Sequence, residues 1–373
     1  MWQRAPGWIR RQEPVSRITE LPTLSVIIPA YRCADMLQRC LDGLLASDLP
    51  RSAWQLIVVD DGSGDDTAAV ATRLADRVIT IPGGPHGPAF ARNRGADSAG
   101  GDVLVFIDAD VVVAPDALRR FAALFRESPA LGAAFGAYDT TPGDPGFLSQ
   151  YRNLLHHWVH VSQPGDAWTF WTGCGAVRRA VFLALGGFDA ARYRSPQIED
   201  IEFGYRVVDA GHRIVLDPDI QGTHLKRWTL VGMLRSDLFD RAIPWMQLLL
   251  RRGDAFGAGP LNVRRREKLF TVLTAIALLG GLAALVTRGT GWLVASAVCL
   301  VGICLGNARL LAWFARTRGP VFALCTIPCR LVFYFESGLG AAWAMLTYRR
   351  HAQTAMSREG DGLEHARSAE NEP

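Results

Sequence analysis

The sequence predicts an α/β protein with a mostly parallel, doubly wound sheet, followed by transmembrane helices. Over residues 24–125, short apolar runs alternate with stretches of helical periodicity, which is the pattern of consecutive βα units. The runs are apolar throughout, as expected of strands that are covered on both faces of a sheet. The C-terminal third adds two long uncharged segments, each close to the roughly 20 residues that cross a bilayer.

Four strands are expected in the first part of the sheet, each followed by a helix. The strands correspond to LSVIIP, QLIVVDD, RVITIP and VLVFIDAD, and the helices to 34–46, 65–75, 88–98 and 115–125. Over 131–224 the pattern becomes less regular. We expect this region to contain an edge strand at GAAFGAYD, an aromatic stretch at WTFWTG and helices near Arg178 and Ile201, and to form the substrate-binding half.

The next segment, 228–265, is predicted to form an amphipathic helix, interrupted at Pro244, and a linker. Its leucines and methionine share one face with arginines beside them, which suits the membrane interface and packing on the core equally. Two transmembrane helices are predicted at 269–286 and 290–308, which carry no charge. Arginines outside both spans place their outer ends and the large domain in the cytoplasm.

A third apolar stretch, 320–347, is interrupted by Pro328, Arg330 and Glu336. We expect it to span the membrane as well; re-entry and a position in the interface are the alternatives. The two charged side chains would be costly in lipid, so they either serve a function or mark where the helix leaves the membrane. The tail, 349–373, is charged and rich in small polar residues and is predicted to be disordered.

Composition excludes one class of partner and indicates the compartment. The net charge of +4 comes almost wholly from arginine, and no basic face with interleaved aromatic residues stands out, so nucleic acid is not an expected partner. The 7 cysteines are scattered without a CxxC motif and are expected to be reduced and buried, as in a cytosol-facing protein. The N-terminal segment, 1–22, lacks the apolar core of a signal peptide and is expected to be a loose basic arm.

Polar residues follow three of the predicted strands at the point where each strand ends. They are found in PAYR after the first strand, DDGS after the second and DAD after the fourth. In an open α/β sheet, ligands bind outside the carboxyl ends of the strands. Asp108 and Asp110 can point the same way, and two carboxylates held close favour a hard cation such as Mg²⁺ or Mn²⁺. Because such a cation completes its shell with water and substrate phosphates, a diphosphate is the expected ligand.

Each candidate motif also has a purely structural interpretation. DAD could end a strand and begin a turn, and DDGS could form an Asx-type turn that caps the next helix. His156 and His160 could bind a metal on one helix face, but no third ligand is evident nearby, and a packed or acceptor-facing helix is preferred. Trp171 and Gly173 could form the floor of a sugar pocket or could pack in the core.

Six motifs resemble those of the family 2 glycosyltransferases: SVIIPAYR, VVDDGSGDDT, GPAFARNRGA, VFIDAD, GGFDA and EDIEFGYR, in that order. The resemblance covers roughly 24–224. It implies the GT-A fold of nucleotide-diphospho-sugar transferases, which is Rossmann-like, in a membrane-anchored bacterial type of enzyme. The domains expected are an N-terminal arm (1–22), a GT-A catalytic domain (23–227), an amphipathic helix and linker (228–265), a membrane region (266–348) and a tail (349–373).

The resemblance assigns roles position by position. It implies nucleotide-binding residues, of which the first three hold the base and the last two lie near the nucleotide and the ribose: Pro29, Tyr31, Asp61, Arg92 and Asp108. It implies that Asp110 ligates the metal and that His224 lies near the metal and the diphosphate. In EDIEFGYR, Asp200 matches the catalytic base, and Glu199 is the alternative. The Gln-x-x-Arg-Trp signature of processive synthases is absent, which implies transfer of a single sugar.

The chemistry that these residues would serve follows from the substrate. A sugar nucleotide is cleaved at the anomeric carbon, and the metal neutralises the charge of the leaving diphosphate. The incoming hydroxyl needs a carboxylate to take its proton, and attack opposite the leaving group predicts inversion. We expect a UDP- or GDP-linked donor and a lipid or lipid-linked acceptor, offering a hydroxyl or phosphate at the membrane. The predicted location is the cytoplasmic (inner) membrane, as a multi-pass protein with its catalytic domain in the cytoplasm.

Two other functions fit parts of the sequence. A strand followed by Asp-x-Asp-x-Val, as in VFIDADVV, also begins the haloacid-dehalogenase-like phosphatases. Those enzymes need a lysine at the site, whereas this chain has only Lys226 and Lys268, and its Asp-x-Asp strand is the fourth instead of the first. The other alternative is a catalytically inactive membrane scaffold, against which the intact Asp61, Asp110 and Asp200 argue.

Overall fold

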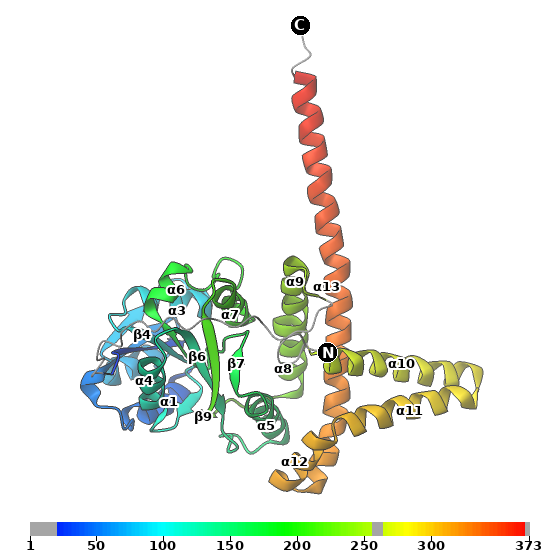
Figure 1. The fold of residues 1–373 in the computed structure, drawn as a ribbon, viewed down its shortest axis with the longest axis horizontal. Coiled ribbons are helices and arrows are strands. Elements are labelled where there is room, and N and C mark those ends of the chain that lie inside the picture. Colours follow the sequence, from blue (N-terminus) through cyan, green and yellow to red (C-terminus); the bar gives the residue numbers. More distant parts are fainter. Residues whose placement is uncertain (1–20, 256–263, 370–373) are drawn as a thin grey trace, which may run out of the picture.

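A computed structural model describes residues 21–255 and 264–369 of the chain (Figure 1). Residues 1–20, 256–263 and 370–373 lie outside the described part. Nearly all of the predicted N-terminal arm and most of the predicted linker before the membrane region therefore fall outside it.

The first half of the sheet is parallel. Its strands are β1 (Leu24–Ala30), β2 (Trp54–Asp60), β3 (Arg77–Thr80) and β4 (Val103–Ile107), in which β1 pairs with β2 and β4, and β2 pairs with β3. The helices that follow them are α1 (Ala34–Leu45), α2 (Thr67–Leu74), α3 (Pro88–Asp97) and α4 (Ala117–Glu127). Two separate clusters of buried apolar side chains cover the two faces of the sheet. The predicted doubly wound α/β arrangement is confirmed.

The second half of the sheet is mixed. Its strands are β5 (Val111–Val113), β6 (Leu131–Tyr138), β7 (Gly165–Ala167), β8 (Cys174–Arg178) and β9 (Arg213–His224), accompanied by α5 (Phe147–Val161), α6 (Arg179–Ala184) and α7 (Glu199–Asp209). Within the described residues, the strand order is β3-β2-β1-β4-β8-β6-β9-β5, with β7 paired to β9. β8 runs antiparallel to β4 and β6, whereas β6 and β9 are parallel. This topology brings β4 and β9, which carry predicted site residues, into one sheet.

The prediction that GAAFGAYD is an edge strand is wrong. β6 lies between β8 and β9, and all of its residues are buried. The small residues that weaken the strand pattern serve close packing instead. A Cβ added to Gly136 would lie 2.1 Å from the carbonyl oxygen of Ile220, so glycine is required where β9 approaches.

The segment after the sheet joins the α/β domain to the C-terminal apolar helices. It forms α8 (Leu230–Arg235), a π-helical stretch η2 (Ser236–Ala242) and α9 (Ile243–Arg252). The helix is therefore interrupted earlier than predicted, in η2 instead of at Pro244. Pro244 lies in the first turn of α9, where the N–H that proline lacks would have no partner within the helix. Met233 and Trp245 are buried against the domain, so packing on the core is observed for this part of the amphipathic segment.

The region predicted to lie in the membrane consists of α10 (Arg265–Thr287), α11 (Thr290–Gly306), α12 (Ala308–Arg318) and α13 (Pro320–Ala369). Among the described helices, α10 and the Pro320–Tyr348 part of α13 are long and apolar enough to cross a membrane. The predicted second span, 290–308, meets that criterion only as α11 together with α12, which are bent by 61° at their junction. The cause lies at Asn307, whose side chain bonds back to the carbonyl of Ile303.

The tail departs from its prediction over 349–369. The helix of α13 continues through Ala369 instead of ending near Tyr348. Extending an existing helix adds one hydrogen bond per residue fixed and avoids the cost of nucleation. In Figure 1, α8 and α9 lie between the catalytic domain and α13, and the α10–α11 hairpin leaves α13 on the side away from that domain.

Candidate active site

Arg92, on α3, connects two of the predicted site motifs. One guanidinium nitrogen donates to Glu199 Oε1 at 2.8 Å and another to Asp108 Oδ1 at 2.7 Å. The side chain of Arg92 is only 4% exposed. Although burial disfavours its charge, the carboxylates of Asp108 and Glu199 raise the pKa of Arg92. Arg92 therefore remains a cation that joins the end of β4 to the start of α7.

Asp110 and His224 meet on the other side of the β4 end. Val111 pairs with His224 in the β5–β9 ladder, which brings His224 Nε2 to 3.4 Å from Asp110 Oδ2. The His224 ring stacks on Tyr138, with centroids 4.4 Å apart. Burial raises the pKa of Asp110, but the hydrogen bond from His224 and the charges of His224 and Lys226 outweigh it and lower the pKa. Asp110 is thus an anion ready to hold a cation.

The site has protein donors for a divalent cation, though few of them. No group of three or more His, Cys, Asp or Glu side chains gathers around one point in the described part of the chain. Asp110 and His224 provide one oxygen and one nitrogen donor at adjacent positions. Mg²⁺ bound with a nucleotide commonly uses one or two carboxylates and takes its other ligands from phosphates and water. The residues present fit such an ion.

Asp200 lies in the first turn of α7. Its Oδ2 accepts hydrogen bonds from the backbone N–H and the hydroxyl of Thr172, at 3.1 and 3.3 Å. Burial and the neighbouring charge of Glu199 raise the pKa of Asp200 to about 7. The residue that caps α7 is Ile198, so Asp200 lies inside the helix and is not its cap. Thr172, whose importance no local sequence signal indicated, holds this carboxylate.

Asp61 is buried under the loop that precedes α3. Its Oδ2 accepts hydrogen bonds from the backbone N–H groups of His86 and Gly87, both at 2.8 Å, and its Oδ1 lies 3.0 Å from His86 Nδ1. The neighbouring Asp60 accepts hydrogen bonds from Ser63. Both aspartates of DDGS are thus hydrogen-bonded within the protein. His86, which the sequence analysis did not single out, lies beside Asp61 at the end of β2.

Pro29 and Tyr31 occupy the end of β1, beside the end of β2. Tyr31 is 36% exposed, and Arg32 follows it with a left-handed φ of 47°. Hydrogen bonds from the Arg32 backbone and side chain to Ser63, at 3.0 and 3.1 Å, hold this unusual conformation. The first two strand ends are therefore tied together, as the predicted convergence requires.

Trp171 and Gly173 lie against each other beside β8. A Cβ on Gly173 would lie 2.4 Å from the Trp171 ring, so the indole packs directly on this glycine. Trp171 also contacts His156 and His160, at centroid distances of 4.8 and 5.3 Å. Burial lowers the pKa of His160 to about 4, and its Nδ1 faces the carbonyl of Gly136. Both rings are packed against Trp171, and within the described residues no third His, Cys, Asp or Glu forms a group with them, so the metal interpretation of this pair is not supported.

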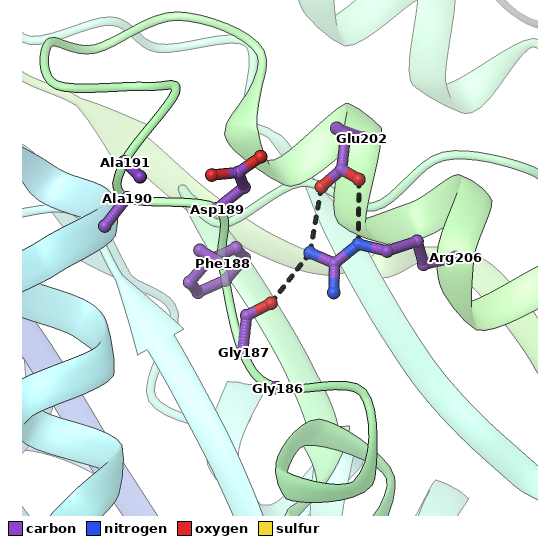
Figure 2. A pocket seen from close by; sticks show the side chains of 8 residues that line it. All are labelled: Gly186, Gly187, Phe188, Asp189, Ala190, Ala191, Glu202 and Arg206. Atoms are coloured by element: carbon purple, nitrogen blue, oxygen red, sulfur yellow. Dashed lines mark hydrogen bonds and ion pairs between the residues drawn. The ribbon is translucent and has the colours of Figure 1, made fainter. Parts of the chain in front are cut away.

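The GGFDA motif forms a loop beside Arg206 and Glu202 (Figure 2), and the ring of its Phe188 lies 5.8 Å from the guanidinium of Arg92. Arg206 bonds to both oxygens of Glu202 and to the carbonyls of Leu185 and Gly187. Asn93, next to Arg92, exchanges two hydrogen bonds with the backbone of Phe188. The loop borders a surface pocket of about 450 Å³. Because Arg206 and Glu202 already bond to each other, they are not free to bind a ligand there, and the motif is better explained as positioning its neighbours.

Comparisons with known proteins identify the domain. Residues 25–186 match the model of Glycosyl transferase family 2. An uncharacterized glycosyltransferase of Nostoc sp. is 32% identical over 181 residues, which is 46% of this chain and 55% of the relative. Validoxylamine A glucosyltransferase of Streptomyces hygroscopicus subsp. jinggangensis is 30% identical over 222 residues, or 51% of this chain and 52% of that protein. The chain thus spans about half the length of these curated relatives.

Among solved structures, a mannosyltransferase from Pyrobaculum calidifontis, in complex with GDP-Man and Mn²⁺, has a similar fold. The TM-score is 0.51 at 20% sequence identity, covering 87% of this chain and 88% of that one. These matches do not favour the phosphatase alternative. Over residues 25–186 the α/β domain of this chain therefore matches glycosyltransferase family 2, and the domain has the GT-A fold.

Proposed function

We propose that this protein transfers a single sugar, with inversion, from a nucleotide-diphospho-sugar to a hydroxyl or phosphate of a membrane-associated acceptor. The observation that carries the proposal is the state of Asp200. Asp200 is a buried carboxyl whose pKa is raised to about 7. It lies in the first turn of α7, and the first residue of that helix, Glu199, accepts a hydrogen bond from Arg92. A general base works best when its pKa lies near the working pH.

The contacts of the two neighbouring acids favour Asp200 as the base. Glu199 Oε1 accepts from Arg92, and its Oε2 accepts from the backbone of Gln197. An acid held by a buried guanidinium is a weak proton acceptor. Asp200 accepts only from neutral donors, Thr172 and the Ile201 N–H. Asp200 would therefore take the acceptor's proton, while Glu199 orients Arg92.

Asp110 and His224 are the residues that would hold a divalent cation, Mg²⁺ or Mn²⁺. Such a cation, when bound, would neutralise charge on the leaving diphosphate. The presence of Mn²⁺ in the mannosyltransferase of similar fold is consistent with this role. Tyr138 supports His224 by stacking on its ring, which orients Nε2 toward Asp110.

The nucleotide would bind at the ends of β1, β2 and β4. Pro29 and Tyr31 would border the base, and Asp108, oriented by Arg92, would meet the ribose. Because the carboxylate of Asp61 is engaged by the loop at His86, we propose that Asp61 acts on the base by fixing that loop. A uridine or guanosine diphosphate sugar is the expected donor class; the structural neighbour carries GDP-Man.

The acceptor would approach from the membrane side. Two apolar helices, α10 and α13, are long enough to span a bilayer, and α8, η2 and α9 connect them to the site. The charge of Arg241, an exposed residue of η2, is close enough to interact with that of Asp200. An exposed cation in the segment that joins the site to the apolar helices would suit a polyprenyl phosphate or another anionic lipid headgroup.

Incubating membranes that contain the protein with radiolabelled sugar nucleotides and Mn²⁺ tests the proposal. We expect label from one donor to enter the lipid extract, and Asp200→Asn and Asp110→Asn to abolish the transfer. Full turnover in either variant would contradict the mechanism. Label that appears only in water-soluble product would contradict the lipid acceptor while leaving sugar transfer intact.

A further inference from the structure

One face of α13 exposes a continuous apolar stripe. Its large members are 37% to 73% exposed. They are Val321, Leu324, Val332, Phe335, Leu339, Trp343 and Leu346. Their spacing of three, four or eight residues puts them on one side of a helix. A single exposed leucine is ordinary in soluble proteins, but a stripe along the whole segment is an interaction surface.

The opposite face of α13 carries Arg330 and Tyr334, which are buried. Arg330 donates to Glu267 Oε2 of α10 at 2.9 Å, and Tyr334 donates to Asn307 Oδ1 at 3.2 Å. Glu336, at the border of the stripe next to Val332 and Leu339, is also only 8% exposed. With charged groups inside and apolar groups outside, the helix has the reverse of the arrangement that water favours. The exposed stripe therefore faces something other than water.

The catalytic domain covers the inner face along much of the length of α13. Near its start, Phe322 packs edge-on against Phe147 of α5, with centroids 5.2 Å apart. Further along, a Cβ on Gly340 would lie 2.6 Å from the Cβ of Ala242, the last residue of η2. Helix α5 in turn packs on the catalytic sheet, through hydrogen bonds from Asn153 and His157 to the end of β6 and the residue after it.

These contacts are incompatible with α13 crossing the bilayer. Residues from Phe322 to Gly340 would lie within the hydrocarbon, and the adjoining faces of α5 and η2 would lie there with them. Those faces hold the Arg152–Asp237 ion pair, with 2.5 Å between nitrogen and oxygen. Carrying part of a water-soluble domain into lipid would leave polar backbone and side-chain groups without partners.

The α10–α11 hairpin differs from α13 in that its apolar surface is not limited to one stripe. It exposes apolar side chains over most of its surface: Leu269, Val272, Ile276, Leu279, Leu282, Leu285, Val286, Leu293, Val294, Val298, Val301 and Leu305. Helix α10 has 23 residues, or about 35 Å at the usual helical rise, against a hydrocarbon core of roughly 30 Å. Helix α11 has 17 residues, which is at the short end of the range of spanning helices. In Figure 1 the hairpin runs crosswise to α13 and away from the catalytic domain.

We propose that the α10–α11 hairpin alone crosses the bilayer and that the Pro320–Tyr348 part of α13 lies flat in the interface. The apolar stripe of α13 faces lipid, the contacts at Phe322 and Gly340 hold the catalytic domain, and Arg330 and Tyr334 face the base of the hairpin. The occupant is the bilayer because the stripe lies beside the hairpin, whose α10 contacts α13 at Phe270 and is itself apolar over most of its surface. The bend of 61° between α11 and α12 turns the chain from the crossing direction into the plane of the membrane.

The two orientations place the end of the chain on different sides of the membrane. A tag added after Pro373 of the full chain, probed by protease or an impermeant reagent in sealed vesicles, should be found on the side of the catalytic domain. A tag at Gly289, between α10 and α11, is the control and should be found on the other side. If the C-terminal tag lies opposite the catalytic domain, α13 crosses the membrane and the proposal is wrong.

A depth measurement tests the in-plane position directly and does not depend on sugar transfer. Spin labels at Leu324, Phe335 and Leu346 should lie at one shallow depth, as reported by oxygen and nickel-chelate accessibility, and a label at Ile276 of α10 should lie deep. In a crossing helix, the first and last of these positions would be about 33 Å apart along the membrane normal. Depths that differ in this way, or labels shielded from lipid by a second copy of the chain, would overturn the proposal.

Discussion

At the scale of single residues, the site depends on charges that hold one another in place. Arg92 is 4% exposed and pairs with two carboxylates that come from different parts of the chain. Glu199 is 107 residues away in sequence. Removing one partner of such a buried group leaves an uncompensated charge, which costs far more than loss of an exposed pair.

Arg92→Met should therefore lower the free energy of unfolding by about 3–5 kcal/mol and abolish donor binding, because Glu199 would be left buried without a cation and the half-buried Asp108 would lose its partner. Arg94→Met on the same helix is the matched control. Arg94 is exposed and lies 3.8 Å from Asp97, so its loss should cost no more than about 1 kcal/mol. Thermal unfolding of both variants in detergent measures the difference; equal effects would contradict the role of Arg92.

Asp200 should give the transfer rate a pH dependence near neutrality. The base works when ionised, so with a pKa of about 7 the rate should fall as pH drops below that value and level off above it. The same shift reduces stability as pH rises from about 4 to 7, since the folded state binds the proton more tightly than the unfolded state. Asp200→Asn should lower kcat by about 10²–10⁴-fold. A rate profile that is flat between pH 5.5 and 8 would exclude this carboxyl as the base.

Asp110 and His224 should control the metal requirement. Mutating a residue that only supports a metal ligand typically lowers metal affinity by about 10–100-fold. Mutating a ligand itself should lower the affinity at least as much. We expect Asp110→Asn and His224→Ala each to raise the Mn²⁺ concentration needed for half-maximal turnover by at least about 10-fold. Asp116→Asn, at an exposed pair with Arg120, is the control. An unchanged metal requirement in both site variants would place the cation elsewhere.

At the scale of elements, η2 connects the site to the membrane helices. On one side, Asp237 pairs with Arg152 of α5, and both are nearly buried. On the other side, Ala242 meets Gly340 of α13 so closely that a side chain would not fit. Short π-helical stretches within helices are frequent at functional sites. The position of η2 between Asp200 and α13 is consistent with a role in bringing the acceptor to the base.

Gly340→Val should separate α13 from η2, because even a Cβ at this position would lie 2.6 Å from that of Ala242. Overpacking of this kind typically costs about 1–3 kcal/mol. We expect a lower unfolding temperature and a raised KM for the acceptor, with KM for the donor unchanged. Gly302→Ala in α11, where a Cβ would meet nothing within 4 Å, should leave all three values as they are. An unaltered acceptor KM in Gly340→Val would argue against the role of η2.

At the scale of the whole molecule, the GT-A domain and the apolar helices make one continuous structure. Within the described residues, α13 contacts α5 and η2 on one side and α10 on the other, which holds it against the α/β domain. The acceptor would therefore have to meet the site at a fixed height above the lipid.

If α10 and α11 are integral to the bilayer, alkaline carbonate should leave the full chain in the membrane pellet, because buried apolar area and not charge would hold it there. A peripheral protein of the same membranes, released by the same treatment, is the control. Release of this chain into the supernatant would show that the hairpin lies on the surface.

The sequence by itself determined the strands, the family and the existence of apolar helices. Continuous apolar runs such as those of β1 and β4, the motif order and the uncharged length of α10 are local properties, and physical rules of periodicity and length interpret them directly. Candidates at the strand ends could also be named, since ligands in α/β sheets bind at that edge.

Only the tertiary structure decided how those candidates differ from one another. Arg92 engages Glu199 but not Asp200, the loop at His86 occupies Asp61, and β6 lies inside the sheet. The same holds for α13, whose polar face is turned toward the protein. Burial, ion pairing and helix orientation depend on contacts between residues far apart in the chain, and no local pattern encodes which of those contacts will form.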